Sequence, residues 1–207
     1  MQNEQRQLHW QHVYQSKGEH DVSWFQDTPA PSLDMMAAIG VTPAASVIDI
    51  GGGASRLVDH LIERGLRNVT VLDLSDAALA AAKARLGERA SRAEWIVADV
   101  TQWEPMMAYD IWHDRAALHF LTDEADRAAY LARLRRALKA GGHAIIATFA
   151  LDGPARCSGL PVVRYSPDSL LRTLGSGFTL VASRTHVHAT PWGSTQSFQF
   201  SAFRFGN

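Results

Sequence analysis

The chain has 207 residues, of which 46% are hydrophobic and 20% are charged. This length and composition predict one globular unit with a real hydrophobic core and exclude a disordered chain. Lysine plus arginine is 20 and aspartate plus glutamate is 21, for a formal net charge of −1. Such a balance gives no electrostatic attraction to nucleic acid or to an anionic membrane, so we expect neither as a partner.

Cysteine content and the apolar pattern restrict the environment. Cys157 is the single cysteine, so an internal disulfide is excluded. The polar start from Met1 to Arg6 leads into no apolar run, and we expect no signal peptide. No apolar stretch approaches the ~18 residues that span a bilayer, so the cytoplasm is the expected compartment.

Residues 1–45 are predicted to form an N-terminal helical arm or lid. Aromatic and apolar residues within 8–14 have helix-like spacing, and two prolines, at 29 and 31, interrupt any helix there. Ser32 is predicted to cap a short helix over residues 33–39, which Gly40 would end.

From Ser46 onward, short apolar runs alternate with helical patterns. Strands are predicted at 47–50, 69–72, 95–98, 109–112 and 144–149. Helices are predicted at 56–65, at 76–86 behind a Ser75 cap, and from a Thr122 cap to Gly141-Gly142. Strands that alternate with helices of this length predict a parallel sheet with right-handed crossovers.

The pattern changes after the fifth strand. Ser166-Pro167 predicts a helix start, with the helix running to about residue 174. Two strands, 178–187 and 196–205, follow with a short connection, which makes them antiparallel, and the aromatic spacing predicts a bulge near Ala202. Residues 46–207 are thus predicted to form one doubly wound, mostly parallel α/β sheet of seven strands with an antiparallel C-terminal strand.

Three strand ends carry groups suited to a nucleoside ligand. Gly51, Gly52 and Gly53 follow the first strand, so a ligand can approach the backbone and the free N–H groups of the next helix. Asp73 ends the second strand, where an acid binds ribose hydroxyls in dinucleotide folds, and Asp99 ends the third, where it can accept from an adenine amino group.

Asp49, just before the glycines, is placed to organise that turn and a cationic amine. Two simpler interpretations stay open, because a glycine run can be only a turn and Asp49 can be only a loop cap. A nicotinamide-dependent reductase is the main alternative function. Its G-x-G-x-x-G pattern fails here, since Arg56 stands in the third glycine place.

The segment 47–55 resembles the first motif of the class I S-adenosylmethionine-dependent methyltransferases, 71–75 resembles the second and 98–100 the third. This resemblance covers residues 46–149. It implies S-adenosylmethionine as cofactor on a Rossmann-like fold, with the glycines beside it, Asp73 on the ribose and Asp99 at the adenine. The predicted cofactor-binding residues are Trp24, Asp49, Gly51, Gly52, Gly53, Asp73, Leu74, Asp99 and Val100.

The segment 110–118 is similar to the stretch after the fourth strand in thiopurine methyltransferases, and residues 127–130 fill the place of their Arg-x-x-Tyr helix. Trp24 resembles the aromatic lid of that family, which acts on small sulfur, selenium or tellurium nucleophiles. A rival resemblance is to small lysine methyltransferases, through Trp24-Phe25 and residues 114–116. Arg115 and the loop 153–161 fit the first family better.

The predicted function is methyl transfer to a small thiol or another soft nucleophile. Protein lysine methylation and non-catalytic binding of the cofactor are the alternatives, and the oligomeric state stays open. Asp114 and His113, together with His119, are candidate proton acceptors, and Arg115 is a candidate to attract an anionic substrate. Asp114 and Arg115 could instead form a structural ion pair. No metal site is predicted, because His186 and His188 have no third ligand in view.

Overall fold

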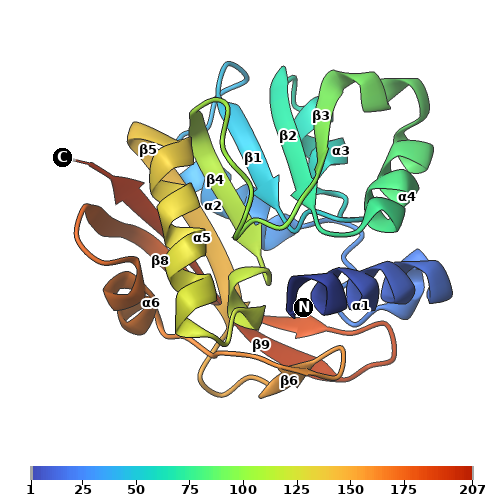
Figure 1. Ribbon diagram of the computed structural model, residues 1–207. Helices are drawn as coiled ribbons and strands as arrows, with labels where there is room; N and C mark the ends of the chain where they lie inside the picture. The colour runs from blue at the N-terminus through green and yellow to red at the C-terminus, as the bar shows by residue number, and fades with distance from the viewer. Residues whose placement is uncertain (1, 207) are drawn as a thin grey trace.

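The computed structural model describes residues 2–206 and contains one seven-stranded sheet of order β3-β2-β1-β4-β5-β9-β8 (Figure 1). Its strands are β1 Ser46–Ile50, β2 Asn68–Asp73, β3 Ala93–Val97, β4 Tyr109–Arg115, β5 Leu138–Phe149, β8 Phe178–Ala189 and β9 Thr195–Phe205. Only β9 runs against its neighbours, β5 and β8, within this sheet. The predicted α/β fold is therefore confirmed, including the antiparallel C-terminal strand.

Helices cover both faces of the sheet, because the central strands β1, β2 and β4 are buried on both sides. The helices are α1 Gln2–Ser16, α2 Ala30–Ala38, α3 Leu57–Glu63, α4 Asp76–Leu86, α5 Glu124–Ala137 and α6 Pro167–Leu174, with short 3₁₀ turns η1 Glu19–Asp21, η2 Gly87–Arg92 and η3 Leu118–Phe120. A small separate hairpin joins β6 Arg156–Cys157 to β7 Leu160–Pro161.

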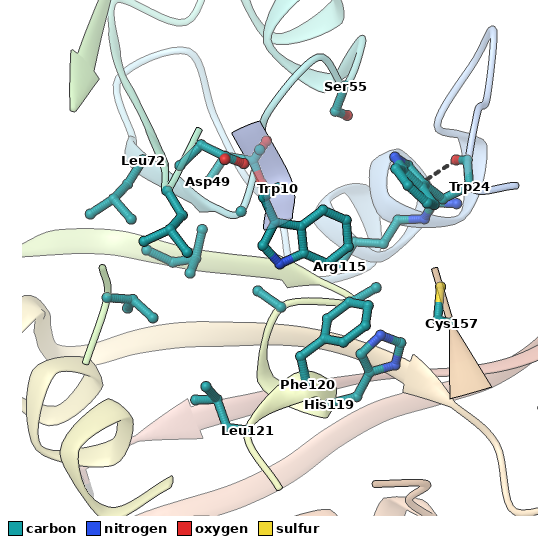
Figure 2. A pocket seen from close by; sticks show the side chains of 18 of the residues that line it. Trp10, Trp24, Asp49, Ser55, Leu72, Arg115, His119, Phe120, Leu121 and Cys157 are labelled. Atoms are coloured by element: carbon teal, nitrogen blue, oxygen red, sulfur yellow. Dashed lines mark hydrogen bonds between the residues drawn. The ribbon is translucent and has the colours of Figure 1, made fainter. Parts of the chain in front are cut away.

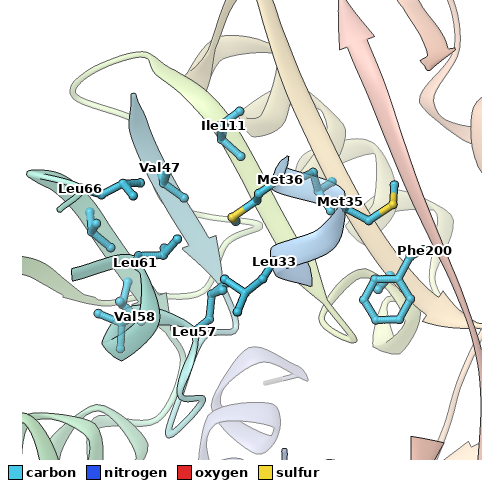
Figure 3. Close-up of a cluster of buried hydrophobic side chains, with 14 of the residues drawn as sticks. Leu33, Met35, Met36, Val47, Leu57, Val58, Leu61, Leu66, Ile111 and Phe200 are labelled. Carbon is cyan, nitrogen blue, oxygen red and sulfur yellow. The ribbon is translucent and has the colours of Figure 1, made fainter. Parts of the chain in front are cut away.

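The core divides between the two faces. On one, Leu33 and Met36 of α2 pack with Leu61 of α3 against Val47 and Ile111 of the sheet (Figure 3). On the other, α5 and α6 cover the alternate strand residues. The order of the strands reverses between β1 and β4, because β2 and β3 extend the sheet on one side of β1, and β4 and β5 extend it on the other. Open α/β sheets bind ligands at this point.

Helix α1 lies across the end of the sheet toward which β1 and β4 point (Figure 1). Gln11 fixes it there, because its Oε1 accepts hydrogen bonds from Ser75 Oγ at 2.9 Å and Ala77 N at 3.2 Å. Arg6 of α1 also pairs with Asp126 of α5 at 2.8 Å. The first helix thus covers the ligand-binding edge, instead of either face.

Several predicted boundaries are confirmed. Ser75 Oγ accepts from Ala78 N at 3.2 Å at the start of α4, and Ser166 forms a capping box at the start of α6. The predicted bulge is present opposite Ala202, where the β8 ladder shifts between Leu180 and Ala182.

Three helix-end predictions are wrong. Ser32 does not cap α2 but lies inside it, because Pro31 fits the first turn and the helix begins at Ala30. Helix α5 has Asp123, not Thr122, at its N-cap. Gly141-Gly142 does not end α5, since the chain already extends at Leu138, which pairs with Tyr109 across a bulge in β5.

Candidate active site

A cavity lies under α1 at the carboxyl ends of β1, β2 and β4 (Figure 2). It holds about 1090 Å³ of space between atoms, open solvent at its mouth included. Eight of the nine predicted cofactor-binding residues line it: Trp24, Asp49, Gly51, Gly52, Asp73, Leu74, Asp99 and Val100. Gly53 is the predicted residue that does not line it.

The glycine turn leaves β1 in a conformation that few residues adopt. Gly51 has φ +64°, and its N–H donates to Leu72 O at 2.8 Å. A Cβ at Gly52 would lie 2.6 Å from Val71 Cγ1 and 2.7 Å from Asp49 Oδ2. Side chains are therefore excluded from the turn, and its backbone forms the floor of the cavity.

Asp73, at the end of β2, is a buried carboxyl without a cationic partner among the described residues. One oxygen accepts from Ser75 N at 2.8 Å. Burial, with the negative charge of Asp49, raises the pKa of Asp73 to about 7, although backbone hydrogen bonds act in the opposite direction. A group that donates hydrogen bonds to this carboxylate would favour its ionised form.

Asp99 presents one free acceptor. Its Oδ1 accepts from Thr101 N and Thr101 Oγ1 at 2.8 and 2.7 Å, which fixes the orientation of the carboxylate. Its Oδ2 is buried and accepts no hydrogen bond, and Arg6 Nη1 lies 3.9 Å away. A buried acceptor left open in this way fits an amino group of a ligand.

Asp49 ends a buried hydrogen-bonded chain. Its Oδ1 is 2.7 Å from His113 Nδ1, and His113 Nε2 is 2.9 Å from Ser32 Oγ of α2. Both ring nitrogens of His113 are therefore engaged, which leaves no lone pair to accept a proton from a substrate. His113 lines the cavity, but its geometry is that of a group that orients Asp49.

Asp114 does not line the cavity, and this corrects its prediction as a proton acceptor. In β4 its side chain points to the opposite face from that of Arg115. Its oxygens accept from Ala117 N at 2.8 Å, Leu118 N at 3.0 Å and Tyr130 Oη at 2.6 Å. Burial raises the pKa of Asp114 to about 6, although these hydrogen bonds favour the ionised form and lower it. The side chain holds the loop after β4.

Arg115 points into the cavity and pairs with no described carboxylate, so the alternative ion pair with Asp114 is also wrong. Its Nη1 donates to Trp24 O at 3.0 Å, and its guanidinium carbon lies 5.5 Å from the centre of the Phe198 ring. Nε and Nη2 are buried without a hydrogen-bond partner. Burial lowers the pKa of Arg115 to about 10, so the group stays charged at neutral pH.

Sequence reasoning assigned Trp24 of the aromatic roof, but it did not assign Phe120 or the far wall of the cavity. Trp10 of α1 packs edge-on against Phe120 at 4.9 Å and against Trp24 at 5.7 Å between ring centres. Phe198 of β9 and Cys157 of β6 form part of the opposite wall. The aromatic content of the arm was the signal for the roof. The sequence carried no signal for Phe198 and Cys157, because their segments reach the cavity only in the folded protein.

Residues 47–142 match the model of a family described as a methyltransferase domain. This central part of the chain is therefore similar to a methyltransferase domain. The predicted enzyme class and cofactor are confirmed at that level. The narrower resemblance to thiopurine methyltransferases stays a prediction.

Curated relatives of the methyltransferase domain differ in substrate. Trans-aconitate 2-methyltransferase of Acidovorax sp. (strain JS42) is 30% identical over 113 residues, which are 54% of this chain and 41% of that protein. The eEF1A lysine and N-terminal methyltransferase of Bos taurus is 24% identical over 151 residues, which are 69% of this chain and 21% of that protein. The chain thus spans less than half the length of these relatives.

Solved structures share the fold of the methyltransferase domain. Burkholderia thailandensis 1,6-didemethyltoxoflavin-N1-methyltransferase, with S-adenosylhomocysteine bound, has a TM-score of 0.71 at 22% identity, over 100% of this chain and 90% of that one. The glycopeptide N-methyltransferase MtfA, complexed with S-adenosylmethionine, has a TM-score of 0.66 at 18% identity, over 90% and 98%. Within residues 2–206, no helix is long and apolar enough to cross a membrane.

Proposed function

We propose that the chain transfers a methyl group from S-adenosylmethionine to a small-molecule nucleophile that enters the covered cavity. The observation that carries this proposal is the aromatic roof, in which Trp10 and Trp24 lie over the cavity and Phe120 closes the side. An acceptor must fit beneath this roof beside the cofactor. The volume accommodates a small molecule more readily than the surface of a folded protein.

The described residues fit the proposed cofactor at its two distinctive ends. The open Oδ2 of Asp99 is an acceptor for an adenine amino group, and Asp73 is an acceptor for ribose hydroxyls. Asp49, oriented by His113, lies beside the glycine turn and can accept from the α-amino group. Gly51, Gly52, Leu74 and Val100 then border the ligand.

The cofactor supplies an electrophilic methyl group on a sulfonium, so the lone pair of the acceptor forms the new bond to carbon as the carbon–sulfur bond breaks to leave a thioether. The chain contributes chiefly position, which can offset about 7–11 kcal/mol of a barrier. Residues 1–45 are proposed to act as a lid that excludes water from the cavity of the domain formed by residues 46–207.

The state of the three candidate bases favours a soft nucleophile over a lysine as the methyl acceptor. Both nitrogens of His113 are engaged, Asp114 faces away, and burial lowers the pKa of His119 to about 3. A thiol titrates near ~8.5 and is partly ionised without help, whereas an amine near ~10.4 needs a base. Cys157 is no acceptor itself, because burial raises its pKa to about 11.

Protein lysine methylation is the second candidate. The observation in its favour is the likeness to lysine and N-terminal methyltransferases, which covers 69% of this chain. A protein side chain would have to enter past Trp24-Phe25. This candidate and the first predict different labelled products.

The test has two stages. S-adenosylhomocysteine, and not NAD, should raise the melting temperature of the purified protein. Methyl-labelled S-adenosylmethionine is then added with a desalted host lysate and a panel of small thiols. Label in the small-molecule fraction supports the proposal. Label confined to a discrete protein band refutes it and supports the second candidate.

A further inference from the structure

Arg115 presents the edge of its guanidinium that binds planar anions. Nε and Nη2 lie on the same side of the group and form one fork, and both are buried without a partner. The remaining nitrogen, Nη1, is used by Trp24 O at 3.0 Å. The backbone of the arm therefore holds the guanidinium while the fork stays open.

The described groups around this fork are donors and one carboxylate, Asp49, whose negative charge acts on Arg115 although the two form no hydrogen bond or ion pair. Cys157 and His119 lie on the same side of the cavity as Arg115 (Figure 2). His119 Nδ1 accepts from Phe149 N at 3.4 Å, so the proton of the neutral ring is assigned to Nε2, which is buried without a partner. Burial keeps the pKa of the Cys157 thiol high, at about 11, so that group is uncharged.

The position of the fork points to the acceptor side of the cavity. Arg115 stacks on Phe198 of β9 and has neighbours in η3 and β6. Asp49 of β1 supplies one negative charge that acts on Arg115. The other two acids suited to the cofactor, Asp73 and Asp99, come from the ends of β2 and β3. A sulfonium bound in the same cavity would bring a second positive charge, which an anionic acceptor would offset.

We propose that the methyl acceptor carries a carboxylate, which the Nε–Nη2 fork of Arg115 binds in bidentate fashion while His119 Nε2 donates a further hydrogen bond. This inference rests on the proposed function and narrows its substrate class to small organic acids that bear a nucleophile. Arg115 is then a specificity-determining residue. Trp24, through its carbonyl, positions it.

The first experiment measures binding to the protein saturated with S-adenosylhomocysteine. Two matched pairs are titrated by calorimetry: 3-mercaptopropionate with 3-mercaptopropionamide, and 2-mercaptobenzoate with 2-mercaptobenzamide. We expect at least one acid to bind about tenfold to a hundredfold more tightly than its amide, because only the acid fills the charged fork. Equal affinities in both pairs, or no binding of either acid, overturn the inference.

Variants assign the preference to the fork. Arg115→Gln should lose the preference for the acid, and Arg115→Lys, which keeps the charge but not the fork, should retain a small part of it. Arg92→Gln is the matched control, because Arg92 is exposed beside the amino end of β3. An Arg115→Gln variant that still prefers the acid overturns the inference.

A second arm separates the carboxylate of the acceptor from that of the cofactor. S-adenosylhomocysteine and 5′-methylthioadenosine, which lacks the amino-acid tail, are titrated against wild type and Arg115→Gln. We expect the variant to change neither affinity more than about threefold. Loss of affinity for S-adenosylhomocysteine alone assigns the fork to the cofactor tail and overturns the inference.

Failure here is distinguishable from failure of the proposed function. A protein that methylates small acids and their amides equally well retains the proposed function and loses this inference. A protein that labels only polypeptide loses both.

Discussion

At the residue scale, burial separates the acids of this protein into different roles. Asp114 and Asp73 are both buried strand-end carboxyls whose pKa is raised by burial. Asp114 is surrounded by three donors and stabilises a loop, whereas Asp73 lines the cavity and has room for ligand donors. Hydrogen-bond partners, not the residue type, decide which of the two can bind.

The raised pKa of Asp73, about 7, makes cofactor affinity depend on pH. Ribose hydroxyls donate to the ionised form, so S-adenosylhomocysteine should bind more tightly as pH rises from 6 to 8 and level off above. The folding stability of the ligand-free protein should change in the opposite direction. Because the pKa of Asp73 is raised in the folded state, the stability it contributes is fully present below the ordinary carboxyl pKa and is lost as pH rises through about 7. Titration calorimetry across this range tests both the step and its absence in Asp73→Asn, and a flat wild-type profile contradicts it.

Tyr130→Phe should destabilise the protein without weakening cofactor binding. The change removes the 2.6 Å bond to Asp114 and leaves Trp112 Nε1, now 2.8 Å from the hydroxyl, without its acceptor. We expect a loss of about 1–3 kcal/mol in urea unfolding. Tyr109→Phe is the control, since its hydroxyl bonds only the neutral Thr70 at 3.2 Å and should cost less. A large change in S-adenosylhomocysteine affinity would argue against a purely structural role.

At the scale of elements, α1 and α2 have different tasks although both precede the sheet. Helix α2 contributes Leu33, Met35 and Met36 to the core. Helix α1 is mostly exposed or half-buried and contacts the rest of the protein through Trp10, Gln11 and Arg6. Loss of α1 should therefore open the cavity and leave the core intact.

Deletion of residues 1–17 should give a folded protein with at least about tenfold weaker binding of S-adenosylhomocysteine, because one wall of the cavity is lost. Trp10→Ala should reproduce part of the effect. Leu8→Ala on the same helix is the control, since that side chain is 68% exposed. Circular dichroism checks the fold, and unchanged affinity of the truncated protein would disprove the proposed lid.

At the scale of the whole molecule, ion pairs link the arm to the helices α3, α4 and α5. Glu19 lies 2.9 Å from Arg56 Nε and 3.2 Å from Arg85 Nη1, and Arg6 pairs with Asp126. Burial would raise the pKa of Glu19, but its bond to Arg56 and the two positive charges lower it. Partly exposed ion pairs thus hold the arm, the proposed lid, at both of its ends.

Release of S-adenosylhomocysteine should be about two- to fivefold faster at 0.5 M than at 0.05 M salt, because salt screens exposed ion pairs. Glu19→Gln should release it faster at low salt and show a smaller salt effect. Glu88→Gln is the control, since Glu88 is exposed on η2. Stopped-flow displacement measures the rates, and equal salt dependence in wild type and Glu19→Gln would refute this role for the ion pairs.

The sequence by itself determined the order of strands and helices and predicted many residues of the cavity wall, because those residues follow strand ends locally. The glycine turn, Asp73 and Asp99 were predicted in this way, and they line the cavity. Tertiary structure alone decided the acceptor side. Whether Asp114 or Arg115 faces the cavity depends on the extent of β4, and the partners of Arg115, Trp24 and Phe198, lie 91 and 83 positions away in the chain. Contacts over such separations arise from the packing of the arm and β9 against the sheet, which local patterns do not encode.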